Sequence, residues 1–134
     1  MTYERDYAFT RALPGVSLQD AVARVRQALS AEGFGVLTEI DVQATLKQKI
    51  GVERRPYLIL GACNPKLAHQ ALQAEPAIGV FLPCNVDVFE GDDGVTYVQT
   101  VRPDTMFGLV KNPGVAPIAE EVGARLRRVL EALG

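Results

Sequence analysis

Apolar and polar residues alternate along the chain in patterns that predict five strands and four helices. Strand-like stretches carry apolar residues at every second position or in short continuous runs, whereas helix-like stretches repeat them every three to four residues. The predicted strands are residues 3–13, 34–40, 56–62, 78–90 and 95–101, and the predicted helices are residues 18–32, 42–50, 65–75 and 116–133. The order β-α-β-α-β-α-β-β-α contains too few uniform βαβ units for a doubly wound parallel sheet, so it predicts an α+β domain.

Residues that cap helices stand at the predicted helix boundaries. Ser17, Asp41 and Asn64 each precede a helical pattern, where a side-chain oxygen can accept a hydrogen bond from a first-turn amide. Gly33 and Gly51 follow two of the patterns, where glycine ends a helix in a left-handed conformation. These signals define the helix boundaries independently of the apolar pattern.

The predicted strands differ in how much of their surface they bury. Residues 56–62 form an uninterrupted apolar run, which is typical of a central strand buried on both faces. The next strand contains Pro83, which cannot donate a ladder hydrogen bond and therefore indicates an edge, a bend or a bulge. Residues 91–94 read Gly-Asp-Asp-Gly and predict a hairpin turn. Residues 105–110 are a candidate short helix.

Length, composition and charge narrow the class of protein. The 134 residues contain 48% hydrophobic and 22% charged residues with no linker-like tract, which predicts one folded domain over residues 1–134. The net charge of −2 lacks the basic excess of nucleic-acid binders, so no nucleic-acid partner is expected. No apolar stretch reaches the ~18 residues of a membrane span, and we expect a cytoplasmic protein without a membrane partner.

Two cysteines are the main candidates for chemistry. Cys63 and Cys84 each precede an asparagine, Asn64 and Asn85, and each lies near the end or bend of an apolar strand. Cys63 also precedes a helix start, where peptide dipoles favour a reactive thiolate. The alternative is that both cysteines are small buried fillers, as free cysteine often is. The pattern leaves both interpretations open.

A second candidate is an anion site near the predicted helix at residues 42–50. Asp41, Lys47 and Lys49 fall on this short segment, and the amides at the start of the Asn64 helix could share an anion with the lysines. In the plainer interpretation, Asp41 caps the helix and the lysines are solvated.

Signatures of well-known enzyme classes are absent from the sequence. There is no Cys-x-x-Cys pair, no glycine-rich phosphate loop and only one histidine, His69, so no metal site is predicted and no cofactor is identified. Whether the protein catalyses a reaction stays open.

Three segments stand out as a set: Ile40-Asp41 with Lys47-Gln48-Lys49, then Leu60-Gly61-Ala62-Cys63-Asn64-Pro65, then Leu82-Pro83-Cys84-Asn85-Val86. In this order they resemble the bacterial and archaeal domain-of-unknown-function family 302. The resemblance implies a curved, mainly antiparallel sheet with helices on one face, similar to the TATA-box-binding-protein-like fold, and frequent homodimers. It implies no established activity. The family signature includes Asp41, Lys47, Asn64, Pro65, Pro83, Cys84 and Asn85, which favours Cys84 over Cys63.

Two functional hypotheses follow. In the first, a homodimer binds a small molecule or anion in a pocket between sheet and helices, with Cys84 and Asn85 at its mouth, Lys47 nearby, and Asn64, Cys63 and Asp41 as further ligand-binding candidates. In the second, Cys84 serves a thiol-based redox enzyme or sensor and is resolved by Cys63. The first is favoured because no general base accompanies either cysteine.

Overall fold

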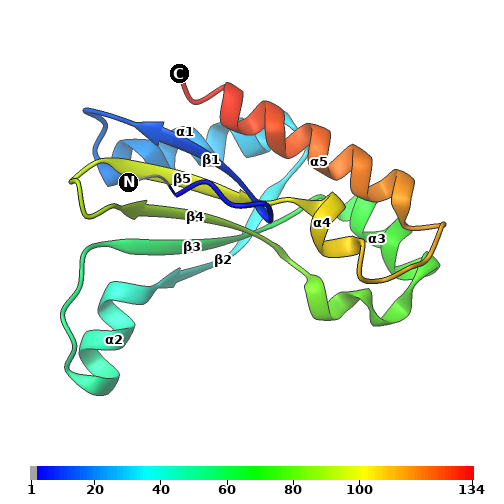
Figure 1. Ribbon diagram of the computed structural model, residues 1–134, viewed down its shortest axis with the longest axis horizontal. Helices are drawn as coiled ribbons and strands as arrows, with labels where there is room; N and C mark the ends of the chain where they lie inside the picture. The colour runs from blue at the N-terminus through cyan, green and yellow to red at the C-terminus, as the bar shows by residue number, and fades with distance from the viewer. Residues whose placement is uncertain (1–2) are drawn as a thin grey trace.

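Five strands, their connecting helices and a 3-10 turn make up residues 3–134, the part of the chain that the computed structural model describes (Figure 1). In chain order the elements are β1 (Ala8–Leu13), α1 (Leu18–Ala31), β2 (Gly35–Asp41), α2 (Val42–Ile50), β3 (Tyr57–Cys63), α3 (Pro65–Ala74), the 3-10 helix η1 (Pro76–Phe81), β4 (Cys84–Glu90), β5 (Thr96–Val101), α4 (Pro103–Phe107) and α5 (Ala116–Glu131).

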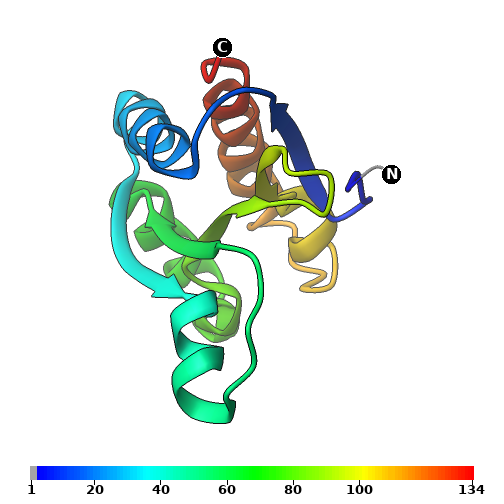
Figure 2. The same ribbon diagram turned by 90° about the vertical axis from the view of Figure 1, so that its left-hand side faces the viewer.

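The strands form one open sheet in the order β1-β5-β4-β3-β2, and every neighbouring pair is antiparallel. Helices α1, α3 and α5 lie on one side of this twisted sheet, as the two views show (Figures 1 and 2). We call that side the covered face and the opposite side the open face. The shorter helix α2 extends beyond the end of β2 and β3 (Figure 2). The predicted α+β class with helices on one face is confirmed.

The covered face holds the aliphatic core. Leu60 lies opposite Val86, and Val88 lies opposite Val98, so these side chains form one patch across the three middle strands. All four are fully buried beneath the apolar faces of α1 and α5. Burying each such side chain contributes about 1.5–3 kcal/mol. This face therefore holds the larger hydrophobic core of residues 3–134.

The predicted helix starts are confirmed by their hydrogen bonds. Ser17 Oγ accepts from the amide of Asp20 at 3.1 Å, and Asp41 Oδ1 accepts from the amide of Ala44 at 2.9 Å. Asn64 Oδ1 accepts from the amide of Leu67, the third residue of α3, at 3.2 Å. The glycine at position 33 follows α1 with φ +83°, the left-handed conformation that its sequence position predicts.

Two predicted strands are shorter than expected. Residues 76–81 form η1 instead of the start of a strand, because Pro76 occupies the first turn of the 3-10 helix. Pro83 has no amide proton for the ladder, and β4 begins directly after it, at Cys84. Residues 3–7 of the first predicted strand leave the sheet at Ala8 and lie across the open face, where Gln99 Nε2 donates to the carbonyl of Tyr3 at 2.6 Å.

The short helix predicted at residues 105–110 occurs earlier, as α4 (Pro103–Phe107), with proline in its first turn. Within residues 3–134, no helix has the length and apolar character needed to cross a membrane.

Candidate functional site

Cys63 and Cys84 lie close together at one end of the sheet. Cys84 is 6% exposed, stands opposite Ala62 and faces the helices, while Cys63 is half-buried at the end of β3. Both line a small apolar notch between the sheet, α3 and α5 that has room for about 30 Å³. That is far below the roughly 300–1,000 Å³ of small-molecule sites. The notch therefore lacks the room for a small-molecule ligand.

Burial also sets the protonation state of Cys84. Burial, and after it the neighbouring Cys63, raises the pKa of this thiol to about 11. Since the thiolate is the reactive form of cysteine, Cys84 is a protonated, weakly nucleophilic thiol at neutral pH. Its environment matches that of a buried filler.

The polar residues expected around the cysteines cap helices or form ion pairs within the fold. Asn64 caps α3, and its Nδ2 donates to the carbonyl of Glu32 at 3.4 Å, which ties α3 to the end of α1. Asp41 caps α2, and the exposed Lys47 forms an ion pair with Glu53 at 3.4 Å. These hydrogen bonds account for the capping oxygens without a ligand.

The structure places Lys47 and Asp41 far from the cysteines. Asp41 pairs with Leu58 near the start of β3, whereas Cys63 is the last residue of that strand and pairs with Gly35. At about 3.3 Å per residue, the five steps from Leu58 to Cys63 separate these positions by roughly 17 Å. A shared pocket of Lys47 with Cys84 therefore does not form, because most of the length of β3 lies between them.

Asn85 is on the opposite side of the sheet from Cys84. Successive side chains of a strand alternate between faces, so Asn85 is exposed on the open face, opposite Gly61. It belongs with a group of residues on that face that sequence reasoning did not single out.

The open face carries an aromatic row. Tyr57, Phe89 and Tyr97 lie opposite one another on β3, β4 and β5. The rings of Tyr57 and Phe89 stack with centroids 5.0 Å apart, and those of Phe89 and Tyr97 stack at 5.7 Å. Tyr3 packs on the last two, at 5.2 Å from Phe89 and 4.6 Å from Tyr97. The N-terminal segment thereby covers part of the row and leaves the Tyr57 end accessible.

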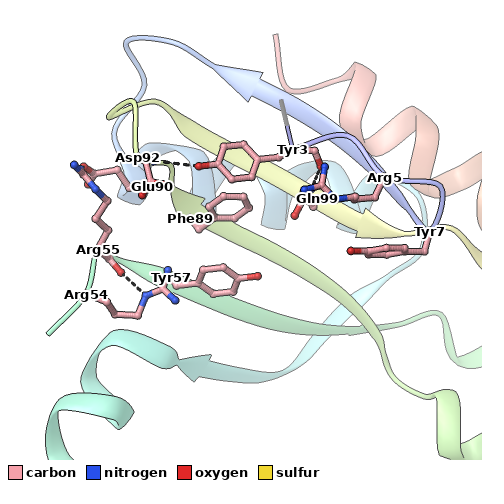
Figure 3. Close-up of a pocket in the computed structure, with 10 residues that line it drawn as sticks. All are labelled: Tyr3, Arg5, Tyr7, Arg54, Arg55, Tyr57, Phe89, Glu90, Asp92 and Gln99. Carbon is pink, nitrogen blue, oxygen red and sulfur yellow. Dashed lines mark hydrogen bonds and ion pairs between the residues drawn. The ribbon is translucent and has the colours of Figure 1, made fainter. Parts of the chain in front are cut away.

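Beside this row lies a cavity of about 620 Å³, the volume of a typical small-molecule site (Figure 3). It is lined by Tyr3, Arg5, Tyr7, Arg54, Arg55, Tyr57, Phe89, Glu90, Asp92 and Gln99. Three arginines oppose two carboxylates in this lining, so the cavity has an excess of positive charge although the whole chain is acidic.

Arg54 lines the cavity and has no carboxylate partner among residues 3–134. Its guanidinium lies over the ring of Tyr57, 4.9 Å from the centroid, and its Nε donates to the carbonyl of Arg55. Gln43 of α2 donates to the carbonyl of Arg54 at 2.9 Å and so holds the loop in place. Arg55, in contrast, is neutralised by Glu90 at 2.5 Å.

The hydroxyl of Tyr57 lies between Arg54 and Tyr7 along the cavity (Figure 3). It donates to Oδ2 of Asp87 at 2.8 Å. Burial, and then the nearby Asp87 carboxylate, raises the pKa of Tyr57 far above its usual value, so the phenol keeps its proton. Burial raises the pKa of Asp87 as well, and the hydrogen bond from Tyr57 opposes that shift. In Figure 3 the hydroxyl end of Tyr7 points toward that of Tyr57.

The sequence contained a signal for this site. Tyr57 and Ile59, Asp87 and Phe89, and Tyr97 and Gln99 are each spaced two apart, so each pair shares one face of its strand. Only the pairing register shows that these faces are the same side of the sheet.

Comparisons with known proteins identify relatives without an assigned activity. The family model "Domain of unknown function DUF302" matches residues 9–133. An uncharacterized conserved protein of Bacillus stearothermophilus, described as DUF302 and known as a crystal structure, is 28% identical. The match has a TM-score of 0.89 and covers 97% of this chain and 100% of that one. A comparison with curated proteins finds no match.

Proposed function

The chain belongs to the DUF302 family, and from that premise we propose that it acts as a small-molecule-binding domain whose site is the open-face cavity. The observation that carries the proposal is the lining of this cavity. The exposed Tyr7 and the half-buried Tyr57 supply apolar contact area, and the Arg54 guanidinium, which has no carboxylate partner among residues 3–134, supplies a charge for an anionic group. Within the Pro83-Cys84-Asn85 segment, Asn85 is exposed on this face, whereas Cys84 is buried on the covered face.

The aromatic row favours a small ligand over a nucleic-acid strand. Proteins that bind single strands on an open sheet present exposed rings on which bases stack. Here Phe89 is 4% exposed and Tyr97 8% exposed, because these rings stack on each other and beneath Tyr3. A similarity to the TATA-box-binding-protein-like fold, which we retain as a proposal, therefore brings no DNA-binding role with it.

The thiol-based alternative receives less support. A redox site needs a thiolate that solvent can reach, and the raised pKa and 6% exposure of Cys84 describe the opposite environment. Cys63 is close enough to raise the pKa of Cys84. The thiol-based alternative therefore takes the form of a disulfide between these two cysteines under strong oxidation.

We also propose that two copies associate through β2. This edge strand is exposed along almost its whole length, and Leu37 and Ile40 are 66% and 49% exposed on it. An antiparallel pair of identical edge strands is self-complementary about a two-fold axis. Ile40→Lys should then shift the sedimentation coefficient to that of a monomer, and Val80→Lys, at another exposed apolar residue, should not.

The binding proposal is tested by nuclear magnetic resonance of the ¹⁵N-labelled protein. A panel of planar acids, planar amines and aliphatic acids would be titrated, and the amide shifts mapped onto the structure. We expect saturable shifts around Tyr57, Phe89 and Gln99. Shifts that instead cluster around Cys63 and Cys84, or a panel without saturable shifts at millimolar concentration, would contradict the proposal.

A further inference from the structure

Two neighbouring parts of the open-face cavity offer opposite hydrogen-bonding partners. At one end, the guanidinium of Arg54 has only donors, and its Nε is the nitrogen already used, toward the carbonyl of Arg55. Further along, the hydroxyl proton of Tyr57 is committed to Asp87, so Tyr57 Oη and, behind it, the Asp87 carboxylate present acceptors. Tyr7 and Arg5 line the cavity beyond this hydroxyl (Figure 3).

The ring of Tyr57 connects these two groups. The Arg54 guanidinium lies over its face and Asp87 lies at its hydroxyl, so donor and acceptor are separated by about one phenol ring. Phe89 stacks on the same ring, so a ligand that bridges the two groups meets the edge of Tyr57 and not its face. Aromatic surface for a planar ligand comes from Tyr7, which is 62% exposed and directs its hydroxyl end toward that of Tyr57 (Figure 3).

From this arrangement we infer that the ligand is a planar aromatic anion with a hydrogen-bond donor at the opposite end of its ring, such as a hydroxy- or amino-substituted aromatic acid. The anionic group binds the guanidinium of Arg54, and the donor binds the Asp87–Tyr57 pair. This inference rests on the proposed binding function, because it assigns a chemical class to the ligand of the same cavity.

Aromatic cages that bind ammonium groups are the main competing class of site. Such cages enclose a ligand cation with ring faces. In this cavity the face of Tyr57 already carries the Arg54 guanidinium, which would repel a second cation. Arg55 is matched by Glu90, so the remaining charge of this loop is positive. Anionic ligands are favoured for both reasons.

The test compares four probes that share one ring, by isothermal titration calorimetry. 4-Hydroxybenzoate carries both groups, 4-hydroxybenzyl alcohol lacks the anion, 4-methoxybenzoate lacks the donor, and 4-hydroxybenzylamine replaces the anion by a cation. We expect 4-hydroxybenzoate to bind about tenfold more tightly than the alcohol and about fivefold more tightly than the methoxy compound.

Two variants assign these preferences to residues. Arg54→Gln should reduce the advantage of the acid over the alcohol to within about twofold, whereas Lys49→Gln, which removes an exposed charge on α2, should leave it intact. Tyr57→Phe removes one of the two acceptors, so it should reduce the discrimination between hydroxyl and methoxy compounds and retain the preference for the acid. Thermal melts of each variant check that the fold is kept.

The outcomes separate the two proposals. If all four probes bind the open face with similar affinities, the binding function stands and the assigned ligand class is wrong. If the amine binds most tightly, the cavity is an ammonium cage and the inference is overturned. If no probe binds at millimolar concentration, the assigned ligand class is wrong, and the binding function fails with it only where the wider panel also gives no saturable shifts.

Discussion

The two faces of the sheet are built from the same strands and differ in almost every physical respect. On the covered face, Leu60, Val86 and Val98 are fully buried beneath α1 and α5. On the open face, Tyr57 and Asp87 form a hydrogen-bonded pair beside a cavity of about 620 Å³. Alternation along each strand thus separates the residues that hold the fold together from those available for recognition. Substitutions at neighbouring positions can test how complete this separation is.

The largest effect is expected from truncating the covered face. Leu60→Ala removes a fully buried side chain and should lower the free energy of unfolding by about 2–5 kcal/mol. Ile59→Ala, one residue earlier on the open face, should cost less than half as much because its side chain is only half-buried. Urea denaturation of both variants measures the difference. Equal losses would show that the open face carries as much of the stability.

The next effect concerns the close approach of β2 to β3. A methyl group on Gly61 would lie 2.2 Å from Oγ1 of Thr38 and 2.9 Å from Cγ of Pro83. Gly61→Ala should therefore destabilise the protein by about 1–3 kcal/mol. Gly35→Ala is the matched control, because nothing lies within 4 Å of its added methyl group. If the two variants unfold at the same urea concentration, the strands adjust without cost.

A third substitution distinguishes a packed thiol from a reactive one. Cys84→Ser places a hydroxyl in the apolar notch and should cost about 1–2 kcal/mol. In a Cys63→Ser background, the thiol of Cys84 should react with iodoacetamide at neutral pH no faster than the protein unfolds, since its pKa is raised to about 11. Fast labelling of the native protein would instead revive the thiol-based function.

The smallest effect is a dependence of stability on pH. Because burial raises the native pKa of Asp87, the folded protein retains this proton at a pH where the unfolded chain, with a pKa of about 3.9, has lost it. The stability that Asp87 contributes is therefore complete below about pH 4 and is lost as the pH rises through the native pKa. Asp87→Asn, which can still accept from Tyr57, should remove this loss.

Urea midpoints measured from pH 3 to 7 provide the readout for Asp87→Asn. The variant should gain stability over the wild type as the pH rises, whereas Asp6→Asn controls for the loss of an exposed carboxylate. A constant difference across this range would mean that the Asp87 carboxylate is solvated in the native state.

Local signals in the sequence predicted most of the helices and strands. Ser17, Asp41 and Asn64 begin the helices they were expected to cap, because capping depends on residues only three positions apart. Errors occurred where proline competes with an apolar run. Residues 78–90 look like one strand, yet Pro76 starts a 3-10 turn and β4 begins only after Pro83.

The candidate site was harder to predict because its residues are distant in the sequence. Cys63 and Cys84 were expected to approach each other if their strands were neighbours, and β3 and β4 do pair. Lys47 was expected near them, but it lies beyond the other end of β3, next to Glu53. The cysteines and Lys47 all occur in the segments that resemble the DUF302 family, but the fold places Lys47 far from the cysteines.

By itself, the sequence determined the class of fold, the caps and the family, since each of these depends on composition or on residues close together in the chain. The tertiary structure alone decided that Tyr57, Phe89 and Tyr97 form one row and that Arg54 lies over its end. Strand register is set by packing across the whole sheet, and a shift by one residue would move every side chain to the opposite face. For that physical reason, the cavity exists only in the folded protein.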